Sequence, residues 1–423
     1  MSSEDWPEVR LGDCVDLQTG FPFKSARFTD DPLDVRLVRG DNIVQGRFRW
    51  EGVRRWLRTD LDAYDEYSLE PGDVILAMDR PWIEAGLKYA AVSAEDLPCL
   101  LVQRVSRMRG RNGLSTRFLR YVIGSPSFTE HVLAVQTGTA VPHISGRQIA
   151  DYRFRLPPLV EQERIAGLLG ALDDKIELNR RKNRTLEAMA RAIFRSWFVD
   201  ITSPRGQVGG GESVCRSGEW PEIAFGDTVQ ILSGGTPRTS EPAFWGGEVA
   251  WYSVADAPTD ADVFVVQTQK SITDAGLENS AAQIVPALTT IISARGTVGT
   301  CAMTAQPMAF NQSCFGLRPH DGLGIYYTYF STLTVVDALR RSAHGSVFST
   351  ITRDTFRSVT VRKPPRQLVE AFERAAEPLM NGVLLNVRET RHLVGILDAL
   401  LPRLMSGELR HNVPTGRPGK ADA

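Results

Sequence analysis

Several features that would place this chain in a special class are scarce or missing. The five cysteines are widely spaced and include no Cys-X-X-Cys pair, which argues against a disulfide framework and a zinc site. No apolar run approaches the roughly 20 residues that a membrane-spanning helix needs. Residues 1–6 are polar and acidic, unlike a secretory signal. We therefore expect a folded protein of the reducing cytoplasm without a metal site of its own.

An excess of positive charge is also missing. The chain has 49 Lys and Arg residues against 50 Asp and Glu residues, a net charge of −1. Nucleic-acid-binding domains are commonly basic overall, but local patches decide binding rather than the sum of charges. The composition therefore permits DNA binding. It predicts that the isolated chain binds DNA weakly and that partners supply part of the positive charge.

The sequence does contain a tandem repeat. Its 423 residues exceed what one ordinary core organises, so two or more domains are expected. The two halves match in order over many positions, which indicates a pseudo-twofold internal repeat. The matching segments are 6–9 (WPEV) with 220–223 (WPEI), 71–80 (PGDVILAMDR) with 286–295 (PALTTIISAR), Gly138 with Gly345, and Asn179 with Asn386.

The repeat divides the chain into two heads, each followed by a long helix. The heads alternate short β-like runs with Gly and Pro turns, which is typical of compact α/β units, so the fold class is α+β. A linker that contains Pro204 and three consecutive glycines separates the halves. The predicted parts are the first head 1–156, a long helix 157–200, the linker 201–218, the second head 219–363, a long helix 364–405 and a flexible tail 406–423.

Each long helix carries a sustained heptad pattern. Apolar residues recur at alternating steps of four and three, which specifies a coiled-coil seam. A Pro-Pro pair precedes each pattern and marks the helix entry, because proline is not tolerated inside a helix. The predicted seam and partner-interface residues are Ile165, Leu169, Leu172, Ile176, Asn179, Leu186 and Trp197 in the first helix, and Phe372, Leu379, Val383, Asn386, Leu393 and Leu397 in the second.

Polar residues stand at matching seam positions, Asn179 with Asn386 and Asn183 with Thr390. A polar seam residue lowers stability but fixes the register of a coiled coil. The alternative is a locally splayed seam whose polar groups are hydrated. Trp197 and Phe372 leave a similar choice, because they could seat a partner's helix or pack against the end of the opposite helix.

Two equivalent helices of one chain can pair about a pseudo-twofold axis, and that pairing is an antiparallel coiled coil. We expect it to hold the two heads apart at opposite ends of a rod. B-DNA presents the same face about every 34–36 Å, so two spaced heads suit a bipartite target with an unread spacer. Because the heads differ in sequence, the two half-sites should differ as well.

Several motifs resemble type I restriction-modification specificity subunits, and the resemblance covers nearly the whole chain in the family's order. The segments similar to the family's central conserved region are 156–166 (LPPLVEQERIA), 172–180 (LDDKIELNR) and 192–199 (AIFRSWFV). Those that resemble its second target-recognition domain and distal conserved region are 233–237 (SGGTP), 244–247 (FWGG), 311–314 (NQSC) and 400–407 (LLPRLMSG).

The resemblance implies a non-catalytic DNA specificity subunit whose heads are two target-recognition domains. Such subunits recruit two modification subunits, which bind S-adenosylmethionine and methylate an adenine in each half-site. They also anchor two motor-nuclease subunits that consume ATP with Mg²⁺. By this resemblance the chain binds double-stranded DNA, binds no cofactor itself and has no membrane partner.

Candidate DNA contacts are cations and small polar residues next to turns, because phosphates and base edges need hydrogen-bond donors. Arg80 and Arg295 are equivalent in the repeat and each follows a β-like run; the alternative is a buried ion pair. Arg47, Arg49, Arg54, Arg55 and Arg58 alternate with tryptophans, as in a hairpin on a DNA backbone or a solvated strand face. The remaining candidates are Lys24, Arg27 and Thr139 in the first head, and Arg238, Thr239, Arg340, Arg341, His344, Ser346 and Thr350 in the second.

Two other classes of function are alternatives for this sequence. An autonomous DNA methyltransferase would need an Asn/Asp-Pro-Pro-aromatic motif and a Gly-rich cofactor loop, and an ATPase would need GxxxxGK[ST]; the sequence has none of these. Asp79, Glu84 and Lys88 loosely mimic a nuclease arrangement, but the repeat lacks matching carboxylates near Arg295. A structural protein with a coiled coil and adhesive heads is the second alternative.

Overall fold

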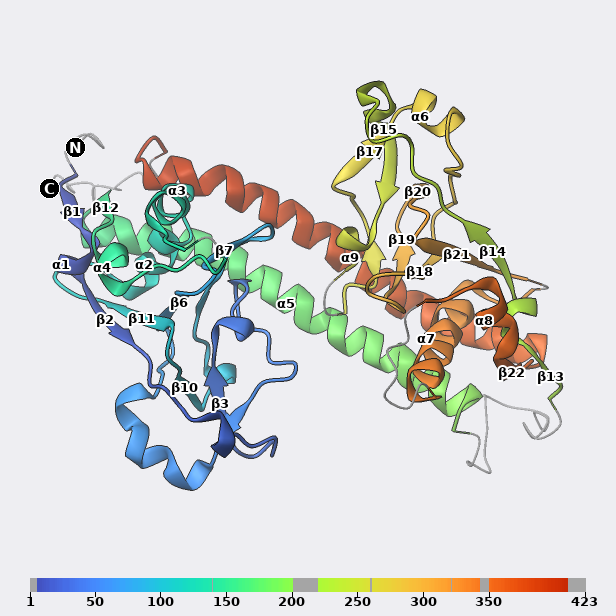
Figure 1. Cartoon of the computed structure of the whole chain (residues 1–423), viewed down its shortest axis with the longest axis horizontal. Coiled ribbons are helices and arrows are strands. Elements are labelled where there is room, and N and C mark those ends of the chain that lie inside the picture. Colours follow the sequence, from blue (N-terminus) through green and yellow to red (C-terminus); the bar gives the residue numbers. More distant parts are fainter. Residues whose placement is uncertain are drawn as a thin grey trace, which may run out of the picture. The chain divides into compact units, whose positions relative to one another are not determined.

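The computed structural model describes residues 6–138, 140–200, 220–258, 261–320, 322–342 and 350–409, with only the backbone for 340–342. Contacts divide the chain into two units, residues 1–173 with 394–423 and residues 174–393. Each long helix, α5 (Leu159–Phe198) and α9 (Arg366–Met405), contributes one part to each unit (Figure 1). Among the described helices, none combines the length and apolarity needed to cross a membrane.

The first head is built on a five-stranded and a three-stranded sheet. The five-stranded order is β2 (Val15–Thr19), β11 (Val105–Gly110), β6 (Val74–Ala77), β9 (Tyr89–Ala91) and β4 (Gln45–Gly46). The three-stranded order is β10 (Cys99–Leu101), β3 (Val35–Val38) and β5 (Arg55–Trp56), and two small sheets pair β1 (Glu8–Arg10) with β12 (Arg153–Arg155) and β7 (Trp82–Ile83) with β8 (Gly86–Leu87). Its helices are α1 (Leu11–Cys14), α2 (Thr116–Ile123), α3 (Pro126–Val135) and α4 (Gly146–Ala150).

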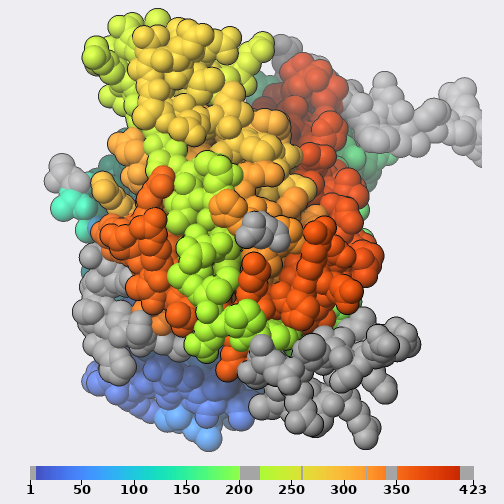
Figure 2. All heavy atoms as spheres, turned by 90° about the vertical axis from the view of Figure 1, so that its right-hand side faces the viewer, coloured from blue at the N-terminus to red at the C-terminus, as the bar shows by residue number. Residues whose placement is uncertain are grey.

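The second head repeats the strand order of the five-stranded, three-stranded and first two-stranded sheets and, among its described residues, has no counterpart of β7 and β8. Its five-stranded order is β14 (Val229–Ser233), β21 (Cys314–Pro319), β18 (Thr290–Ser293), β19 (Cys301–Thr304) and β16 (Phe264–Val265). The smaller sheets are β17 (Lys270–Ile272), β15 (Trp245–Tyr252) and β20 (Ala309–Phe310), and β13 (Glu222–Ala224) with β22 (Thr360–Arg362). Its helices are α6 (Asp274–Glu278), α7 (Ile325–Ser342) and α8 (Arg353–Ser358); in the space-filling view the yellow segment that includes α6 stands above the orange α7 and α8 (Figure 2).

Equivalent hydrogen bonds confirm the repeat at the level of single residues. The N–H of Ile144 donates to the carbonyl of Met78 at 2.9 Å, and that of Ile351 donates to the carbonyl of Ala294 at 2.9 Å. Both bonds tie the end of a central strand to the turn before a short capped helix, α4 or α8. The internal repeat and the mixed helix and sheet content of the predicted fold are therefore confirmed.

Each head packs its core against the beginning of its own long helix. In the first unit, Ile165 and Leu169 of α5 are buried in one apolar cluster with α2 residues such as Phe118 and Leu119. The end of α9 joins the same cluster through Leu401 and Leu404. These heptad positions thus face a head as well as a helix.

The second unit uses the equivalent positions of α9. Phe372 and Ala376, the counterparts of Ile165 and Leu169, are fully buried with Phe330 of α7. Val383 is buried in the same cluster, together with Ala190 and Phe194 of α5. In each unit, therefore, the head packs against the beginning of the long helix that follows it and against the end of the other long helix.

Within the second unit, α5 and α9 run antiparallel. Asn179 lies beside Thr390, Asn183 beside Asn386, and Phe198 beside Phe372. The residue numbers of the contacting partners in α9 therefore decrease as those in α5 increase. This order confirms the predicted antiparallel coiled coil. The other predicted seam residues in this unit are Ile176, which is buried, and Leu186, Trp197, Leu379 and Leu393, which are half-buried; Leu172 and Leu397 of the first unit are also half-buried.

The two polar seam residues of the first long helix are fully buried. The side chains of Asn179 and Asn183 are 0% and 1% exposed. Asn386 donates its amide N–H to the side-chain oxygen of Asn183 at 2.9 Å, and Asn179 donates to Glu389 at 2.8 Å and to Thr390 at 3.4 Å. The alternative of a splayed, hydrated seam is therefore wrong.

Candidate nucleic-acid interface

A polar loop follows the central strand of each head. In the first head, the N–H of Arg80 donates to the carbonyl of Pro142 at 2.7 Å and holds Arg80 at a φ of +45°. Non-glycine residues rarely adopt this left-handed conformation, and such strain tends to gather at functional sites. In the second head Gly296, beside Arg295, takes the positive φ of +76° instead.

Both loop arginines are exposed. Neither Arg80 nor Arg295 has an ion-pair partner among the residues that the structure describes. A buried ion pair, the alternative considered from the sequence, is therefore wrong for both. Their role as DNA contacts stays a prediction.

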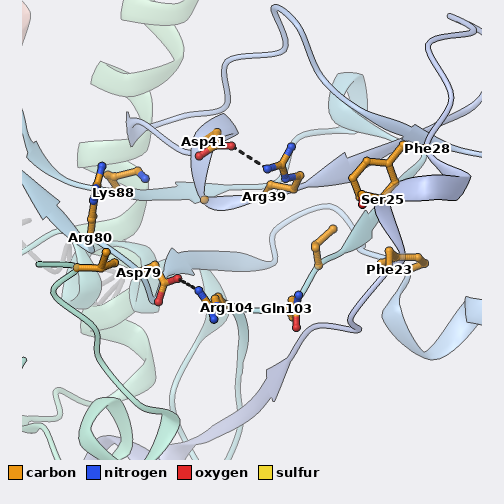
Figure 3. A pocket seen from close by; sticks show the side chains of 13 residues that line it. Phe23, Ser25, Phe28, Arg39, Asp41, Asp79, Arg80, Lys88, Gln103 and Arg104 are labelled. Carbon is orange, nitrogen blue, oxygen red and sulfur yellow. Dashed lines mark hydrogen bonds and ion pairs between the residues drawn. The ribbon is translucent and has the colours of Figure 1, made fainter. Parts of the chain in front are cut away.

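The loop of the first head opens onto a cleft of about 490 Å³. Four cationic side chains and two carboxylates line it, so it carries an excess of positive charge. Figure 3 shows Arg80 and Lys88 together at one end and Phe23 and Phe28 at the other. The charged lining residues are Arg39, Arg80, Lys88 and Arg104 with Asp41 and Asp79. A concave, cationic surface of this kind suits a phosphate-bearing ligand.

Asp79 organises one wall of the cleft. Its Oδ2 accepts a hydrogen bond from Arg104 at 2.8 Å, and its Oδ1 lies 2.7 Å from Nδ1 of His143. Burial raises the pKa of Asp79, but the hydrogen bonds with His143 and Arg104 together outweigh it, and the pKa is lowered. Asp79 thus stays ionised and fixes the direction of Arg104, which Figure 3 shows across the dashed line.

Lys88 is a half-buried cation next to Gly40. Burial lowers the pKa of its ammonium group; Asp41 opposes this and Arg80 adds to it. Among the described residues no acceptor lies within hydrogen-bond distance of the Lys88 ammonium. Because a partly desolvated charge without a partner is costly, an anion in the cleft would offset that cost.

Several arginines of the arginine-rich stretch in the first head make contacts within the head, which the sequence alone does not predict. Arg54 pairs with Asp30 at 2.6 Å, and Arg55 donates to the carbonyl of Asp34 at 2.8 Å. The intervening aromatics are structural as well: Trp56 is core, and Trp50 donates its indole N–H to Asp96. The arrangement resembles a braced strand edge. The DNA role of Arg47, Arg49 and Arg54 stays a prediction; Arg49 and Arg54 are exposed and Arg47 is half-buried.

Lys24 and Arg27 lie near the aromatic end of the cleft. Lys24 is exposed, whereas Arg27 pairs with Asp60 at 2.5 Å and lies 4.7 Å from the centre of the Trp56 ring. Phe23 is buried in the cluster of Trp56. These aromatics are therefore core, and Lys24 is the cation that remains available at this edge.

The candidates of the second head are less gathered. Arg238, Thr239 and Thr350 are exposed loop residues, and the carbonyl of Arg238 accepts the indole N–H of Trp245. Thr139, His344, Ser346 and the side chains of Arg340 and Arg341 lie outside the described residues. Phe372 is fully buried against Phe198 and so is not available to a partner, whereas Trp197 is half-buried.

Three cleft cations are not among the predicted DNA contacts, although Lys88 belongs to the nuclease-like pattern in the sequence. Arg39 follows β3, Lys88 lies between β8 and β9, and Arg104 precedes β11 at a φ of +63°. Each lies next to a strand end, and Arg104 opens the basic stretch 104–111 (RVSRMRGR). Their common signal is position at strand ends, which is visible only when the strands are paired.

The chain matches the family described as the type I restriction modification DNA specificity domain over residues 3–188 and 217–368. Over 96% of this chain and 100% of the relative, it is 24% identical to the type I restriction enzyme HindI specificity subunit of Haemophilus influenzae. A stretch of 170 residues, 40% of this chain and 28% of the relative, is 36% identical to the type I restriction enzyme EcoAI specificity subunit of Escherichia coli.

The fold also resembles a solved structure. The crystal structure of the S subunit of the type I restriction-modification system from M. genitalium superposes with a TM-score of 0.54. The similarity covers 95% of this chain and 96% of that chain, at 15% sequence identity. At this identity the likeness concerns the fold.

Proposed function

Because this chain belongs to the type I restriction-modification DNA specificity family, we propose that it reads a bipartite, asymmetric DNA target. It is a type I specificity subunit with two target-recognition domains, the two heads. Each domain reads one half-site, and the bases between the half-sites are not read. The chain performs no catalysis itself and acts in the cytoplasm.

One observation supports the bipartite target above the others. The two heads share the order of their strands and present an exposed arginine after the same central strand, at Arg80 and Arg295. Beyond that arginine the loops differ, with a hairpin in the first head and the segment Gly296–Thr300 in the second. A shared cation suits a phosphate, which carries no sequence information, and different loops suit different bases.

The proposed partners supply the chemistry. Two modification subunits bring S-adenosylmethionine and methylate one adenine in each half-site, and two motor-nuclease subunits bring ATP and Mg²⁺. A methyltransferase that acts on a duplex base must extrude it. The role of this chain is then to hold the complex in register on the DNA and to scaffold the partner subunits. Such partners also supply cationic surface, which the near-neutral chain needs for strong DNA binding.

A head swap tests the proposal. Genomic DNA from cells that contain this chain and its modification subunit is sequenced for methylated adenines, which gives the two half-sites. Residues 1–156 are then exchanged for the first head of another family member. We expect one half-site to change and the other half-site and the spacer to persist. A change in both half-sites, or a methylated sequence without a gap, would contradict the proposal.

A further inference from the structure

The first head carries a small hairpin that the second head lacks. Strands β7 and β8 pair antiparallel, with Trp82 opposite Leu87 and Ile83 opposite Gly86. They lie in the connection between β6 and β9, residues 78–88. The equivalent connection of the second head, between β18 and β19, is the shorter segment 294–300, which is described throughout and contains no strand.

The outer part of this hairpin is apolar and exposed. Trp82 and Ile83 are each 39% exposed, whereas Leu87 and the preceding Pro81 are buried and anchor the hairpin to the head. Val141, in the segment held to Arg80 by the Arg80–Pro142 hydrogen bond, is exposed as well. Leaving a tryptophan partly in water forgoes burial energy. Three exposed apolar side chains on the hairpin and the segment tied to it suit a ligand-facing surface.

The base of the same hairpin is cationic. The N–H of Lys88 donates to the carbonyl of Pro81 at 2.7 Å and closes the hairpin. This bond places Lys88 close to Arg80, the residue before Pro81. Both cations line the cleft of the first head. The exposed turn carries Glu84 instead. The charges thus run from cationic at the base to acidic at the turn.

This order of charges favours contact between the tip of the hairpin and DNA bases rather than the phosphate backbone. The major groove admits a two-stranded β-ribbon. In that position Arg80 and Lys88 meet phosphates at the groove edge, and Trp82 and Ile83 meet base edges. Glu84 would be repelled by phosphates, whereas a carboxylate can accept a hydrogen bond from the amino group of cytosine.

We propose that Trp82 and Ile83 contact the apolar surface of bases in the half-site read by the first head, and so help to determine its sequence. The inference rests on the proposed function. It extends that function by assigning base contact to a hairpin that belongs to one head. The apolar surface is either the 5-methyl group of a thymine in the major groove or the face of a base that is unstacked when its neighbour is extruded.

The test uses the complex of this chain with its modification subunits and a duplex that carries both half-sites. Trp82→Ala should weaken binding at least about fivefold, the lower end of what an aromatic contact with a base contributes. Trp82→Phe should recover part of the loss. Ile284→Ala, which truncates an exposed apolar side chain of the second head, should bind as the unsubstituted complex does.

Modified duplexes distinguish the two sources of apolar surface. Uracil replaces each thymine in turn, which removes one methyl group. If Trp82 contacts a thymine, one replacement in the first half-site weakens the unsubstituted complex and has no effect on Trp82→Ala. If Trp82 contacts an unstacked base, the fluorescence change of 2-aminopurine beside the methylated adenine on binding differs between Trp82→Ala and the unsubstituted complex, and no replacement shows the thymine dependence. Either result supports the proposal, and replacements in the second half-site should affect both complexes equally.

Two outcomes would overturn the inference while the proposed function stands. In the first, Trp82→Ala binds and discriminates half-sites as the unsubstituted complex does. In the second, Trp82→Ala fails to assemble with the modification subunit, as measured by light scattering, although circular dichroism shows an unchanged fold; the hairpin is then a protein contact. If the unsubstituted complex itself ignores DNA sequence, the proposed function fails.

Discussion

Asn386 donates its side-chain N–H to the side-chain oxygen of Asn183 at 2.9 Å across the antiparallel helices. The repeat relates this pair to a second one, because Asn179 is the counterpart of Asn386 and Thr390 the counterpart of Asn183, and Asn179 donates to Thr390 at 3.4 Å. Two equivalent polar pairs therefore join α5 and α9 within the second unit. Such pairs form only when the helices are in this register.

Breaking one of these pairs should destabilise the fold. Asn386→Ala leaves the oxygen of Asn183 buried without a donor, and an unsatisfied buried group costs about 1–3 kcal/mol. We expect the free energy of unfolding to fall by that amount and the urea midpoint to fall with it. Leu385→Ala, at a neighbouring exposed residue, should leave the midpoint nearly unchanged. Equal midpoints for Asn386→Ala and the unsubstituted chain would show that the pair is energetically neutral.

Much of the fold could be predicted because the repeat supplies long-range information. Asn179 and Asn386 identify equivalent seam positions without any structure, and antiparallel pairing follows from their equivalence. The sequence alone could not predict which seam residues pack against a head. Ile165 and Phe372 have the same heptad position as ordinary coiled-coil residues, yet each is buried in a head's core.

The candidate site was harder to predict, because a charge run does not reveal which acid lies across from it. Arg54 pairs with Asp30, which is 24 residues away in the sequence, so the pairing depends on how the strands fold. Lys88 and Arg104 come from separate segments and line the same cleft only when β9 and β11 join one sheet. The repeat did single out Arg80 and Arg295, since a position kept in two differing heads can be read from one sequence.

The exposed loop arginines should contribute to DNA affinity without regard to sequence. Each phosphate contact removed lowers the slope of log affinity against log salt concentration by about 1. We expect Arg80→Ala and Arg295→Ala each to weaken binding of the full complex and to reduce that slope, measured by fluorescence anisotropy from low to moderate salt. Arg117→Ala, which removes an exposed arginine paired with Glu163 on α5, is the control. An unchanged slope with either loop variant would remove that residue from the interface.

Asp79 should make the stability of the first unit depend on acid. Its folded pKa is lowered, although burial acts in the opposite direction, because His143 and Arg104 bond to the ionised form. A lowered folded pKa gives stability that is present above the unfolded value of about 3.9 and is lost as pH falls through the folded pKa. Asp79→Asn should therefore be less stable than the unsubstituted chain near neutral pH, and the difference should shrink below about pH 4. Urea unfolding at several pH values measures it, and a constant difference would contradict the assignment.

In the second unit, the pKa of Glu373 is shifted in the opposite direction to that of Asp79. Its carboxylate accepts hydrogen bonds from the N–H groups of Ile325, Tyr326 and Tyr327 at 3.1, 3.3 and 2.8 Å, which satisfies the start of α7. Burial nevertheless raises its pKa, with the three N–H groups acting against burial. Helix starts need such acceptors, because the first N–H groups have none within the helix.

Two variants separate the hydrogen bonds of Glu373 from its charge. Glu373→Ala removes every acceptor and should lower the free energy of unfolding by about 1–3 kcal/mol; Glu373→Gln keeps one acceptor and should lose less. Because the folded pKa lies above the unfolded one, the carboxyl group contributes less stability as pH rises from about 4.3 through the folded pKa. The advantage of the unsubstituted chain over Glu373→Gln should therefore be largest in mild acid and fall toward neutral pH. An advantage that grows with pH would mean that the N–H groups outweigh burial and that the pKa of Glu373 is lowered.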